Sequence, residues 1–559
     1  MEYLVIVILF TAFIAFVILS EIMNNKKREK KFIESLYENY GQIPHKEYSL
    51  ERFARMDSYY KRHLRDGQID DITWNDLGMD DIFKRLDYCF SASGEEYLYY
   101  KLRTLVKEPS ENKHFEELVS YFMNAEHERV RLKFLANKLG HTGKYSLYDY
   151  IENLDFLGNR KNTKHLLADL LYIPAIILMF FNFPTGILFF SVIMIYNIIS
   201  YFKEKGEIEP YIVSFAYVVR LLEVSKLITA MGALEFEEEI NILKSGIKKL
   251  GSLSRGAWFV FTGNKYSSSS NPIEMLMDYI KMVFHADIVL FNKMLKTLRD
   301  NTSAVDDMIT AVGVLEASVC VGEFRTSLKG KWCTPVFCDE KKIKIDGLYH
   351  PLLEKPVPNN IEAGGGVLIT GSNASGKSTF LKTVALNILL AGTINTCTAD
   401  YTCTFLCRLF TSMALKDDLS RGESYYMAEI RALKRVLDVA ADKNERVICF
   451  VDEVLRGTNT IERIAASAQI LKSFCAPNVI CFAATHDIEL TYILENEYGN
   501  YHFEEEIRDD DVFFPYKIIK GRSTTQNAIK LLDIMGYDKS ITNEAYSMAG
   551  RFRDTGKWI

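Results

Sequence analysis

Two long apolar segments dominate the hydrophobic pattern of the first half of the chain. Tyr3 to Ser20 is uncharged and close in length to the ~20 residues of a membrane-spanning helix. Leu166 to Phe202 carries one charge, Asp169, and the break Asn182 to Gly186 divides it in two. The pattern predicts an N-terminal anchor and a membrane hairpin. Each half of the second segment is slightly short for a span, so a buried or re-entrant helical pair is the alternative.

Basic residues indicate how these segments are oriented. A basic cluster follows the first segment, whereas a cleaved signal peptide carries its basic residues in front. The cluster consists of Lys26, Lys27, Arg28, Lys30 and Lys31. Basic residues also flank the second segment on both sides, and its turn has none. By the positive-inside rule, the sequence predicts a multi-pass protein of the cell membrane with its N-terminus outside and its bulk in the cytoplasm.

The remaining chain changes its periodicity near residue 330. Before it the spacing is helical, as where Gly94, Leu98 and Leu102 fall at four-residue steps. After it, short apolar runs alternate with helical stretches, which indicates a parallel sheet with helices on both faces. The expected parts are an anchor (1–22), a basic and polar juxtamembrane segment (23–75), an outgoing helical core (76–165), the hairpin (166–202), a returning helical lever (203–335) and an α/β domain (336–559).

Composition narrows the class of protein. A chain of 559 residues with 48% hydrophobic and 25% charged residues is globular and contains several domains. The net charge of −6 gives no general attraction to nucleic acid, so any contact with DNA needs a local basic patch. The ten cysteines are scattered and form no C-x-x-C pair, which favours reduced thiols over a disulfide framework.

The stretch "GSNASGKST", residues 371–379, has the phosphate-binding pattern G-x-x-x-x-G-K-[ST] between an apolar strand and an apolar helix. Gly371 and Gly376 let the backbone curl so that its N–H groups face phosphates at a helix N-terminus. Lys377 is expected to reach the β- and γ-phosphates, and the Ser378 hydroxyl to bind Mg²⁺. The predicted nucleotide-binding residues are Gly371, Ser372, Asn373, Ala374, Ser375, Gly376, Lys377, Ser378 and Thr379.

Two further strand ends carry candidate catalytic groups. "VICFVDE" delivers Asp452 to the Mg²⁺ shell and places Glu453 to orient or deprotonate an attacking water. "AATHD" ends another apolar strand and places His486 where it can sense the γ-phosphate. The sequence therefore predicts a P-loop ATPase with ATP and Mg²⁺ as its cofactors, with Ser378 and Asp452 as the metal ligands.

The order of "GSNASGKSTFLKTVALNILLAG", "DDLSRGESYYMAEI", "FVDEVLRGTNTIERIA" and "AATHDIELT" resembles the ATPase domain of the MutS family, the DNA mismatch-repair ATPases and their relatives. The resemblance covers about residues 349 to 545, with the lead-in "HPLLEKPVPNNI" and a tail "YKIIKGRSTTQNAIKLLDIMGY". Upstream, residues 86–102 resemble the start of the family's helical core, and "AVGVLEASVCVGEFRTSLKGKWCTPVF" resembles its return helix.

The resemblance implies roles for single residues and a dimer. Asn373 matches the family's P-loop asparagine, and His486 matches its switch histidine. Ser424 matches the serine that completes the site of the opposite subunit. It opens a predicted helix, so its hydroxyl and the first free N–H groups can point at a phosphate, whereas a plain N-cap needs the serine alone. The resemblance thus implies composite sites in a homodimer, a C-terminal dimerisation segment, and binding of mismatched or otherwise unusual DNA.

The chain departs from mismatch-repair MutS in two places. Only about 50 residues separate the basic cluster from the helical core, too few for the mismatch-recognition and connector domains. The apolar hairpin falls between the outgoing and returning helices, where MutS proteins carry their DNA clamp. The expected function is a membrane-anchored MutS-family ATPase that couples ATP hydrolysis to DNA binding. The alternatives are a membrane ATPase like an ABC transporter, suggested by "LSRGE" and the spans, and an ATP-driven membrane scaffold with no DNA role.

Overall fold

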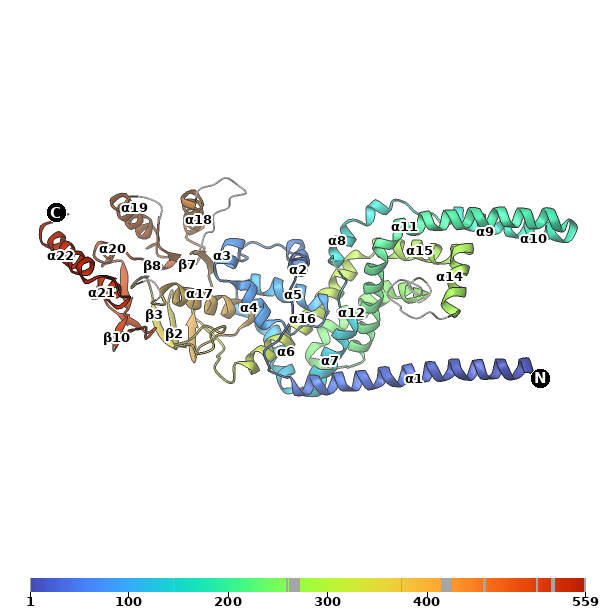
Figure 1. Ribbon diagram of the computed structural model, residues 1–559, viewed down its shortest axis with the longest axis horizontal. Coiled ribbons are helices and arrows are strands. Elements are labelled where there is room, and N and C mark those ends of the chain that lie inside the picture. Colours follow the sequence, from blue (N-terminus) through green and yellow to red (C-terminus); the bar gives the residue numbers. More distant parts are fainter. Residues whose placement is uncertain are drawn as a thin grey trace. The chain divides into compact units, whose positions relative to one another are not determined.

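The chain folds into two compact units, each built from several separate segments (Figure 1). The computed structural model describes residues 2–143, 145–257, 260, 272–372, 375–413, 425–455, 459–508, 511–523 and 528–556. The first, the helical unit, comprises Met1–His63, Asp87–Tyr100 and Glu117–Glu323. The second, the sheet unit, comprises Leu64–Leu86, Lys101–Glu116 and Phe324–Ile559.

The helical unit consists of long helices around one apolar core. Its helices are α1 (Glu2–Glu38), α2 (Leu50–Arg62), α5 (Ala92–Arg103), α6 (Lys113–Asn124), α7 (Glu126–Leu139), α8 (Leu147–Glu152), α9 (Thr163–Leu170), α10 (Tyr172–Phe181), α11 (Phe183–Thr229), α12 (Glu237–Leu250), α14 (Pro272–Phe284), α15 (Ala286–Arg299) and α16 (Thr302–Ser327). Core side chains from distant segments, such as Phe122, Leu221, Phe291 and Leu315, are almost fully buried together. The helical periodicity predicted on both sides of the hairpin is therefore observed.

Helices α5 and α16 approach each other closely at a glycine. A Cβ atom added to Gly94 would lie 2.2 Å from Oε2 of Glu316. The Glu316 carboxylate is 2% exposed and accepts hydrogen bonds from the backbone N–H groups of Phe90 and Ser91. The four-residue stripe that begins at Gly94 is thus the contact face of α5, and the glycine leaves room for a buried carboxylate.

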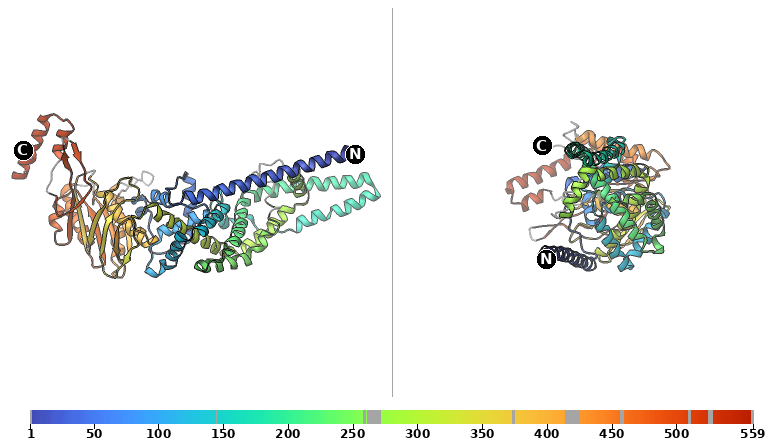
Figure 2. Two further views of the ribbon diagram at one scale, coloured as in Figure 1. Left: turned by 90° about the horizontal axis from the view of Figure 1, so that it is seen from below. Right: turned by 90° about the vertical axis from the view of Figure 1, so that its right-hand side faces the viewer.

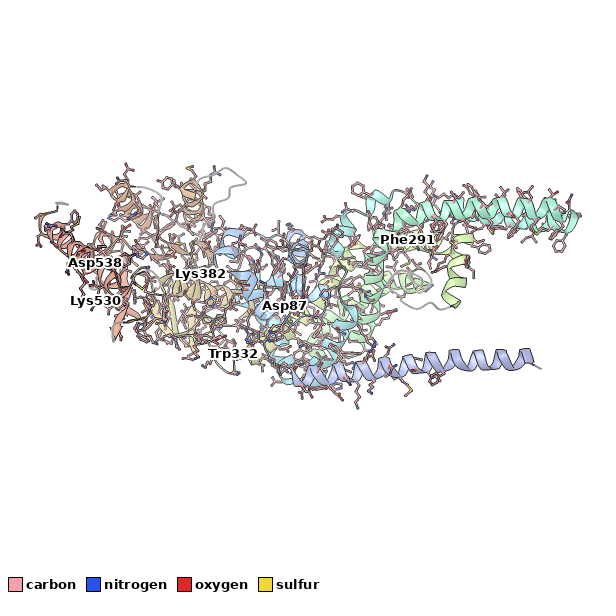
Figure 3. All side chains as sticks on the ribbon, in the orientation of Figure 1. Asp87, Phe291, Trp332, Lys382, Lys530 and Asp538 are labelled. Atoms are coloured by element: carbon pink, nitrogen blue, oxygen red, sulfur yellow. The ribbon has the colours of Figure 1, made fainter. Side chains whose placement is uncertain are left out.

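The segment predicted to be juxtamembrane, residues 23–75, packs in part onto the same unit. Lys46 Nζ lies 2.8 Å from Oδ1 of Asp87, and the Tyr48 hydroxyl donates a 2.5 Å hydrogen bond to the same carboxylate, which Figure 3 labels. Arg55 donates to the buried Glu95 at 2.9 Å. These ion pairs and hydrogen bonds hold residues 46–55 against α5 and against Asp87, which lies just before α5.

Helices α9 and α10 run antiparallel to the first half of α11 and form an apolar hairpin. In the described part of the chain, two helical stretches are long and apolar enough to cross a membrane. They are α9 together with α10 (Thr163–Phe181) and α11 (Phe183–Thr229). Asn182 makes the turn, since its N–H donates to Leu178 O at 2.8 Å and its side chain accepts from Thr185 N at 3.3 Å. Figures 1 and 2 show that the hairpin and the free end of α1 project in the same direction.

The sheet unit contains a six-stranded sheet in the order β12-β9-β4-β8-β7-β6 and a four-stranded sheet in the order β1-β5-β2-β3. In the larger sheet only β12 is antiparallel to its neighbour. The strands are β1 (Val336–Phe337), β2 (Ile343–Leu348), β3 (Asn359–Ala363), β4 (Gly366–Thr370), β5 (Tyr401–Thr404), β6 (Arg408–Ser412), β7 (Val447–Asp452), β8 (Val479–Ala484), β9 (Tyr498–Phe503), β10 (Glu506–Arg508), β11 (Asp511–Phe513) and β12 (Ile518–Lys520).

Helices cover the larger sheet. They are α17 (Lys377–Ile394), α18 (Tyr425–Ala440), α19 (Thr460–Ser473) and α20 (Glu489–Ile493), with α21 (Ala528–Ile534) and α22 (Lys539–Thr555) at the C-terminus. Every residue of β7 and β8 is buried, because helices α18 and α19 pack their apolar residues on one face and α17 contacts both strands. Continuous apolar strands are the expected sequence of such a sheet, and the predicted α/β architecture is observed.

Two short helices from the N-terminal part complete the sheet unit. They are α3 (Asp71–Asp76) and α4 (Met79–Leu86). The Asp76 carboxylate accepts a 2.7 Å hydrogen bond from the Thr411 hydroxyl and a 2.9 Å hydrogen bond from Met413 N. Helix α3 lies at the boundary between the predicted juxtamembrane segment (23–75) and the predicted helical core (76–165), and neither pattern indicates that it packs beside β6.

Candidate functional site

The carboxyl ends of three neighbouring strands meet at one edge of the larger sheet. Ile369 of β4 and Asp452 of β7 are both in register with Ala484 of β8, which lies between them. The ladder continues one residue further, as Thr485 N donates to Ile369 O at 3.0 Å and Glu453 N donates to Ala484 O at 2.9 Å. The residues that follow these strands are therefore held side by side, although the sequence separates them widely.

The glycine-rich loop leaves β4 at this edge and leads into α17. Gly371 has φ +146° and Gly376 has φ +104°, a backbone region that favours glycine. A Cβ atom at Gly371 would lie 2.9 Å from Phe503 O, so space also requires glycine there. The Ser375 hydroxyl donates to Ser372 O at 2.8 Å and closes the loop. Asn373 and Ala374 lie outside the described residues.

Lys377 is the first residue of α17, and its side chain folds over the loop. Its Nζ donates to Gly371 O at 2.7 Å and to Ser372 O at 2.9 Å, and it lies 3.4 Å from Nε2 of His486. The residue is 5% exposed. An ammonium group held beside the positive end of a long helix dipole is suited to bind an anion such as a phosphate. Ser378 and Thr379 follow in the first turn and are exposed.

Glu453 and His486 form a hydrogen-bonded pair at the same edge. Nε2 of His486 lies 2.8 Å from Oε1 of Glu453. Glu453 has φ +55°, which is unusual for a residue other than glycine, and such conformations occur often at functional sites. The neighbouring Asp452 is 7% exposed. One ring nitrogen of His486 thus faces both Lys377 and Glu453, so three of the predicted residues are in contact.

The predicted metal ligands are of the right chemical type. Mg²⁺ prefers hard oxygen donors and is usually held by one or two protein groups together with water and substrate phosphates. Asp452 supplies a carboxylate at the end of β7, and Ser378 supplies a hydroxyl at the start of α17. Among the described residues no group of three or more His, Cys, Asp or Glu side chains forms a metal-binding cluster. The donors fit Mg²⁺ bound jointly with a triphosphate.

A pocket of about 400 Å³ opens next to the loop. It is lined by Leu348, Tyr349, His350, Leu353, Lys355, Pro356, Val357, Asn359, Thr379, Phe380, Thr383 and Tyr516. The Tyr516 ring is 3.2 Å from where a Cβ of Gly376 would be, so the pocket borders the loop directly. Its mixture of aromatic, apolar and amide groups suits a flat nucleotide base. The lead-in "HPLLEKPVPNNI" supplies much of this wall, but its residue spacing alone does not predict a role in nucleotide binding.

Two contacts with carboxylates that the sequence does not indicate support the site. Arg463 of α19 donates to both oxygens of Asp487, at 3.0 and 2.6 Å, and the hydrogen bond to this carboxylate raises the pKa of Arg463. Asp487 directly follows His486, so the pair fixes the segment that presents the histidine. The Ser372 hydroxyl donates to the buried Glu505 at 2.8 Å, which ties the loop to the segment after β9.

Ser424 lies outside the described residues, as does the rest of residues 414–424. Helix α18 begins at Tyr425, so a helix starts directly after Ser424, as the sequence predicts. The role of Ser424 in a partner's site stays a prediction.

Comparison with known proteins agrees with this geometry. The family model MutS domain V matches residues 367–553. The DNA mismatch repair protein MutS of Clostridium novyi (strain NT) is 28% identical over 254 residues, 43% of this chain and 27% of that protein. The MutS of Halothermothrix orenii is 30% identical over 283 residues, 48% of this chain and 31% of that protein. Human MutS protein homolog 4 is 27% identical over 304 residues, 50% of this chain and 32% of that protein.

The chain therefore spans about a third of the length of these relatives. The matched region contains β4, the glycine-rich loop, β7, β8 and the C-terminal helices, which are the elements that build the sheet edge described above. Residues 367–553 match MutS domain V, and over this region the chain is similar to DNA mismatch repair MutS proteins and to MutS protein homolog 4.

Proposed function

We propose that the sheet unit binds ATP with Mg²⁺ and hydrolyses it at the edge formed by β4, β8 and β7. The observation that carries the proposal is the contact of Lys377, His486 and Glu453 at the ends of three adjacent strands. A cationic side chain, an acid–base pair and the N-terminus of a long helix meet at one point, and phosphoryl transfer to water requires groups of these kinds.

Each residue has a separate task in the proposed reaction. Backbone N–H groups of the loop and Lys377 bind the β- and γ-phosphates, and Ser378 and Asp452 hold Mg²⁺, which neutralises phosphate charge when bound. Glu453 accepts the proton of the attacking water. His486 donates to Glu453 and lies beside Lys377, so it orients the base and detects whether a γ-phosphate is present. The bordering pocket accepts the adenine base.

The full enzyme in this proposal is a homodimer with shared sites. The support is the stretch "DDLSRGES" directly before α18, which resembles the family signature that acts across a dimer. Ser424 then contributes its hydroxyl to the triphosphate held by the other subunit, and ATP binding draws two sheet units together. The helical unit transmits that movement as a lever.

Binding of mismatched or otherwise unusual DNA is proposed as the output. The support is that two of the similar proteins are named DNA mismatch repair proteins. The overall charge is negative, so contact with DNA needs a local surface such as the basic face of α12, whose last turn carries Lys248 and Lys249.

Attachment to a membrane is supported by the distribution of side chains over the hairpin. Asn197 and His165 are 0% and 2% exposed, whereas Phe180 and Phe181 are 86% and 85% exposed. Burying polar groups while exposing apolar ones is unfavourable in water and favourable in lipid. Ion pairs between Arg160 or Lys164 and Glu204 lie at the base of the hairpin, where the chain would return to water.

The experiment that tests the activity is the ATPase rate of the detergent-solubilised protein. We expect Mg²⁺-dependent hydrolysis that is lost in Lys377→Ala and retained in Lys472→Ala, which removes an exposed lysine of α19. Duplex, mismatched and branched DNA are then added at fixed salt, because phosphate contacts make binding salt-dependent. No ATP binding by the unsubstituted protein would refute the proposed site, and an unchanged rate with all three DNAs would refute the DNA-coupled output.

A further inference from the structure

Helix α14 is fixed across the foot of the apolar hairpin. It contacts α11 and, in Figure 1, runs across the direction of α9 and α10. Helix α14 ends at Phe284, and the next residue, His285, has φ +48° and turns the chain into α15. Asn197 of α11 holds the junction between α14 and α15. Its side-chain Nδ2 donates to Val283 O at 2.9 Å, and its backbone carbonyl oxygen lies 2.9 Å from Nε2 of His285.

Over residues 278–284 of α14, the exposure of the side chains is the reverse of that on a helix in water. Tyr279, Ile280 and Phe284 are 59%, 36% and 44% exposed. Lys281 is 2% exposed, and its ammonium group donates to Asp278 of the same helix at 3.2 Å. A surface helix of a water-soluble domain exposes its lysine and buries its isoleucine and phenylalanine, because that arrangement removes apolar area from water.

The exposed apolar side of α14 is continuous with the hairpin. The Phe284 ring lies 5.6 Å from the ring of Tyr172 on α10, and Val283 packs against a small cluster made by α10 and α11. Ile195 and Ile199, on the side of α11 turned away from the junction, are 54% and 66% exposed. Helix α14 is therefore packed against a hairpin whose outer side is apolar, and it adds exposed apolar side chains of its own.

We propose that α14 is an interfacial membrane helix, lying along the boundary between lipid headgroups and acyl chains. The proposal rests on the membrane attachment proposed above. A helix that crosses a membrane hairpin lies near the plane of the bilayer, where one apolar face meets acyl chains. Tyrosine is enriched at this depth, and a lysine paired with an aspartate in the same helix keeps its charge neutralised there. The occupant of this face is thus lipid.

The experiment places a benzophenone photo-crosslinking residue at single positions of the full chain, reconstituted in phosphatidylcholine–phosphatidylglycerol vesicles. The test positions are Ile280 and Phe284, and Phe181 at the turn of the hairpin is the membrane control. Leu234 is the matched exposed apolar control: it is 80% exposed but lies past the end of α11, about 50 Å along the helix from Asn197.

We expect lipid adducts from positions 181, 280 and 284 and none from position 234. Mass spectrometry should locate the adducts of positions 280 and 284 on acyl carbons near the glycerol. If position 181 gives lipid adducts while 280 and 284 give none, or give only protein adducts, the inference about α14 is wrong and the attachment stands. If position 181 also gives no lipid adduct, the proposed membrane attachment itself fails. Adducts of 280 and 284 at the methyl ends would show deep insertion and also overturn the interfacial assignment.

Discussion

Glu453 is held in a strained backbone conformation by its neighbours, and this bears directly on its proposed role. Its N–H continues the ladder to Ala484, and its carboxylate meets His486 at 2.8 Å. A glutamate at φ +55° costs on the order of 1–3 kcal/mol, which the surrounding contacts must offset. These contacts hold the Glu453 carboxylate at the mouth of the glycine-rich loop and restrict its rotation in solvent.

Glu453→Gln tests this role. The amide keeps the shape and the contact with His486 but cannot accept a proton, so we expect ATP hydrolysis to fall by about 100-fold or more while ATP binding is retained. Glu462→Gln, on the exposed first turn of α19, is the control and should hydrolyse ATP normally. The measurements are steady-state phosphate release and binding of a fluorescent ATP analogue. Unchanged turnover in Glu453→Gln would remove Glu453 as the base.

Two buried glutamates of the helical unit predict a pH dependence of stability. Burial raises the pKa of Glu96 to about 8 and that of Glu316 to about 7. The folded chain keeps protons that the unfolded chain releases near pH 4.5, so the free energy of unfolding falls as pH rises from about 5 to 8. Burial would also raise the pKa of Glu95, but His141, Lys46 and Arg52 outweigh it and lower that pKa to about 2. The lowered pKa of Glu95 stabilises the fold fully once the same glutamate is ionised in the unfolded chain, by about pH 6. Glu95 therefore adds nothing to the change in stability at higher pH.

Glu96→Gln should remove most of the fall between pH 6 and pH 8. The neutral amide keeps a partner for the Ser146 hydroxyl, which lies 2.9 Å from Oε1, and we expect about 1–2 kcal/mol of added stability at pH 8. Denaturant unfolding of the detergent-solubilised protein at pH 6, 7 and 8 measures it. Glu126→Gln, at an exposed glutamate of α7, should leave the slope unchanged. An equally steep slope in Glu96→Gln would show that Glu96 is charged in the folded state.

Only some of the positions through which the helices pack can be recognised in the sequence. Gly94 stands at the start of a regular stripe, but the stripe does not show that a carboxylate fills the space above it. We expect Gly94→Ala to destabilise the helical unit by about 1–3 kcal/mol, because Glu316 is pinned by its hydrogen bonds and cannot move away. Gly206→Ala, at an exposed position of α11 with no atom within 4 Å, should instead stabilise by about 0.5–1 kcal/mol. Equal effects of the two substitutions on thermal unfolding would contradict this packing.

Strand ends and glycine turns are the parts of the site that the sequence predicts well. A phosphate-binding pattern needs glycine at fixed positions for geometric reasons, and both Gly371 and Gly376 have the backbone angles that this reasoning requires. Arg463, Asp487 and Tyr516 were not predicted, because each acts through a neighbour distant in sequence and none belongs to a local pattern. The same holds for Asp76, whose partners Thr411 and Met413 lie more than 300 residues away.

The molecule as a whole is predicted to work as a pair of chains. A Lys377→Ala chain lacks the phosphate contact and a Ser424→Ala chain lacks the contribution to its partner, so either alone should be nearly inactive. In a mixed dimer one site contains an intact loop and an intact serine. Random mixing should then restore roughly a quarter of the unsubstituted ATPase rate, since half of the dimers are mixed and each has one complete site. No recovery at any mixing ratio would contradict shared sites.

The chain passes back and forth between its two units, and this has a consequence for how the protein is made. Residues 64–86 and 101–116 belong to the sheet unit, but the strands that they pack against are translated only after the whole hairpin. During synthesis these early segments emerge long before β6, so that Thr73 and Asp76 lack their partners Thr411 and Met413 until late in translation. Biosynthesis of the protein should therefore depend on chaperones, and the second half expressed on its own, from residue 324, should be poorly soluble.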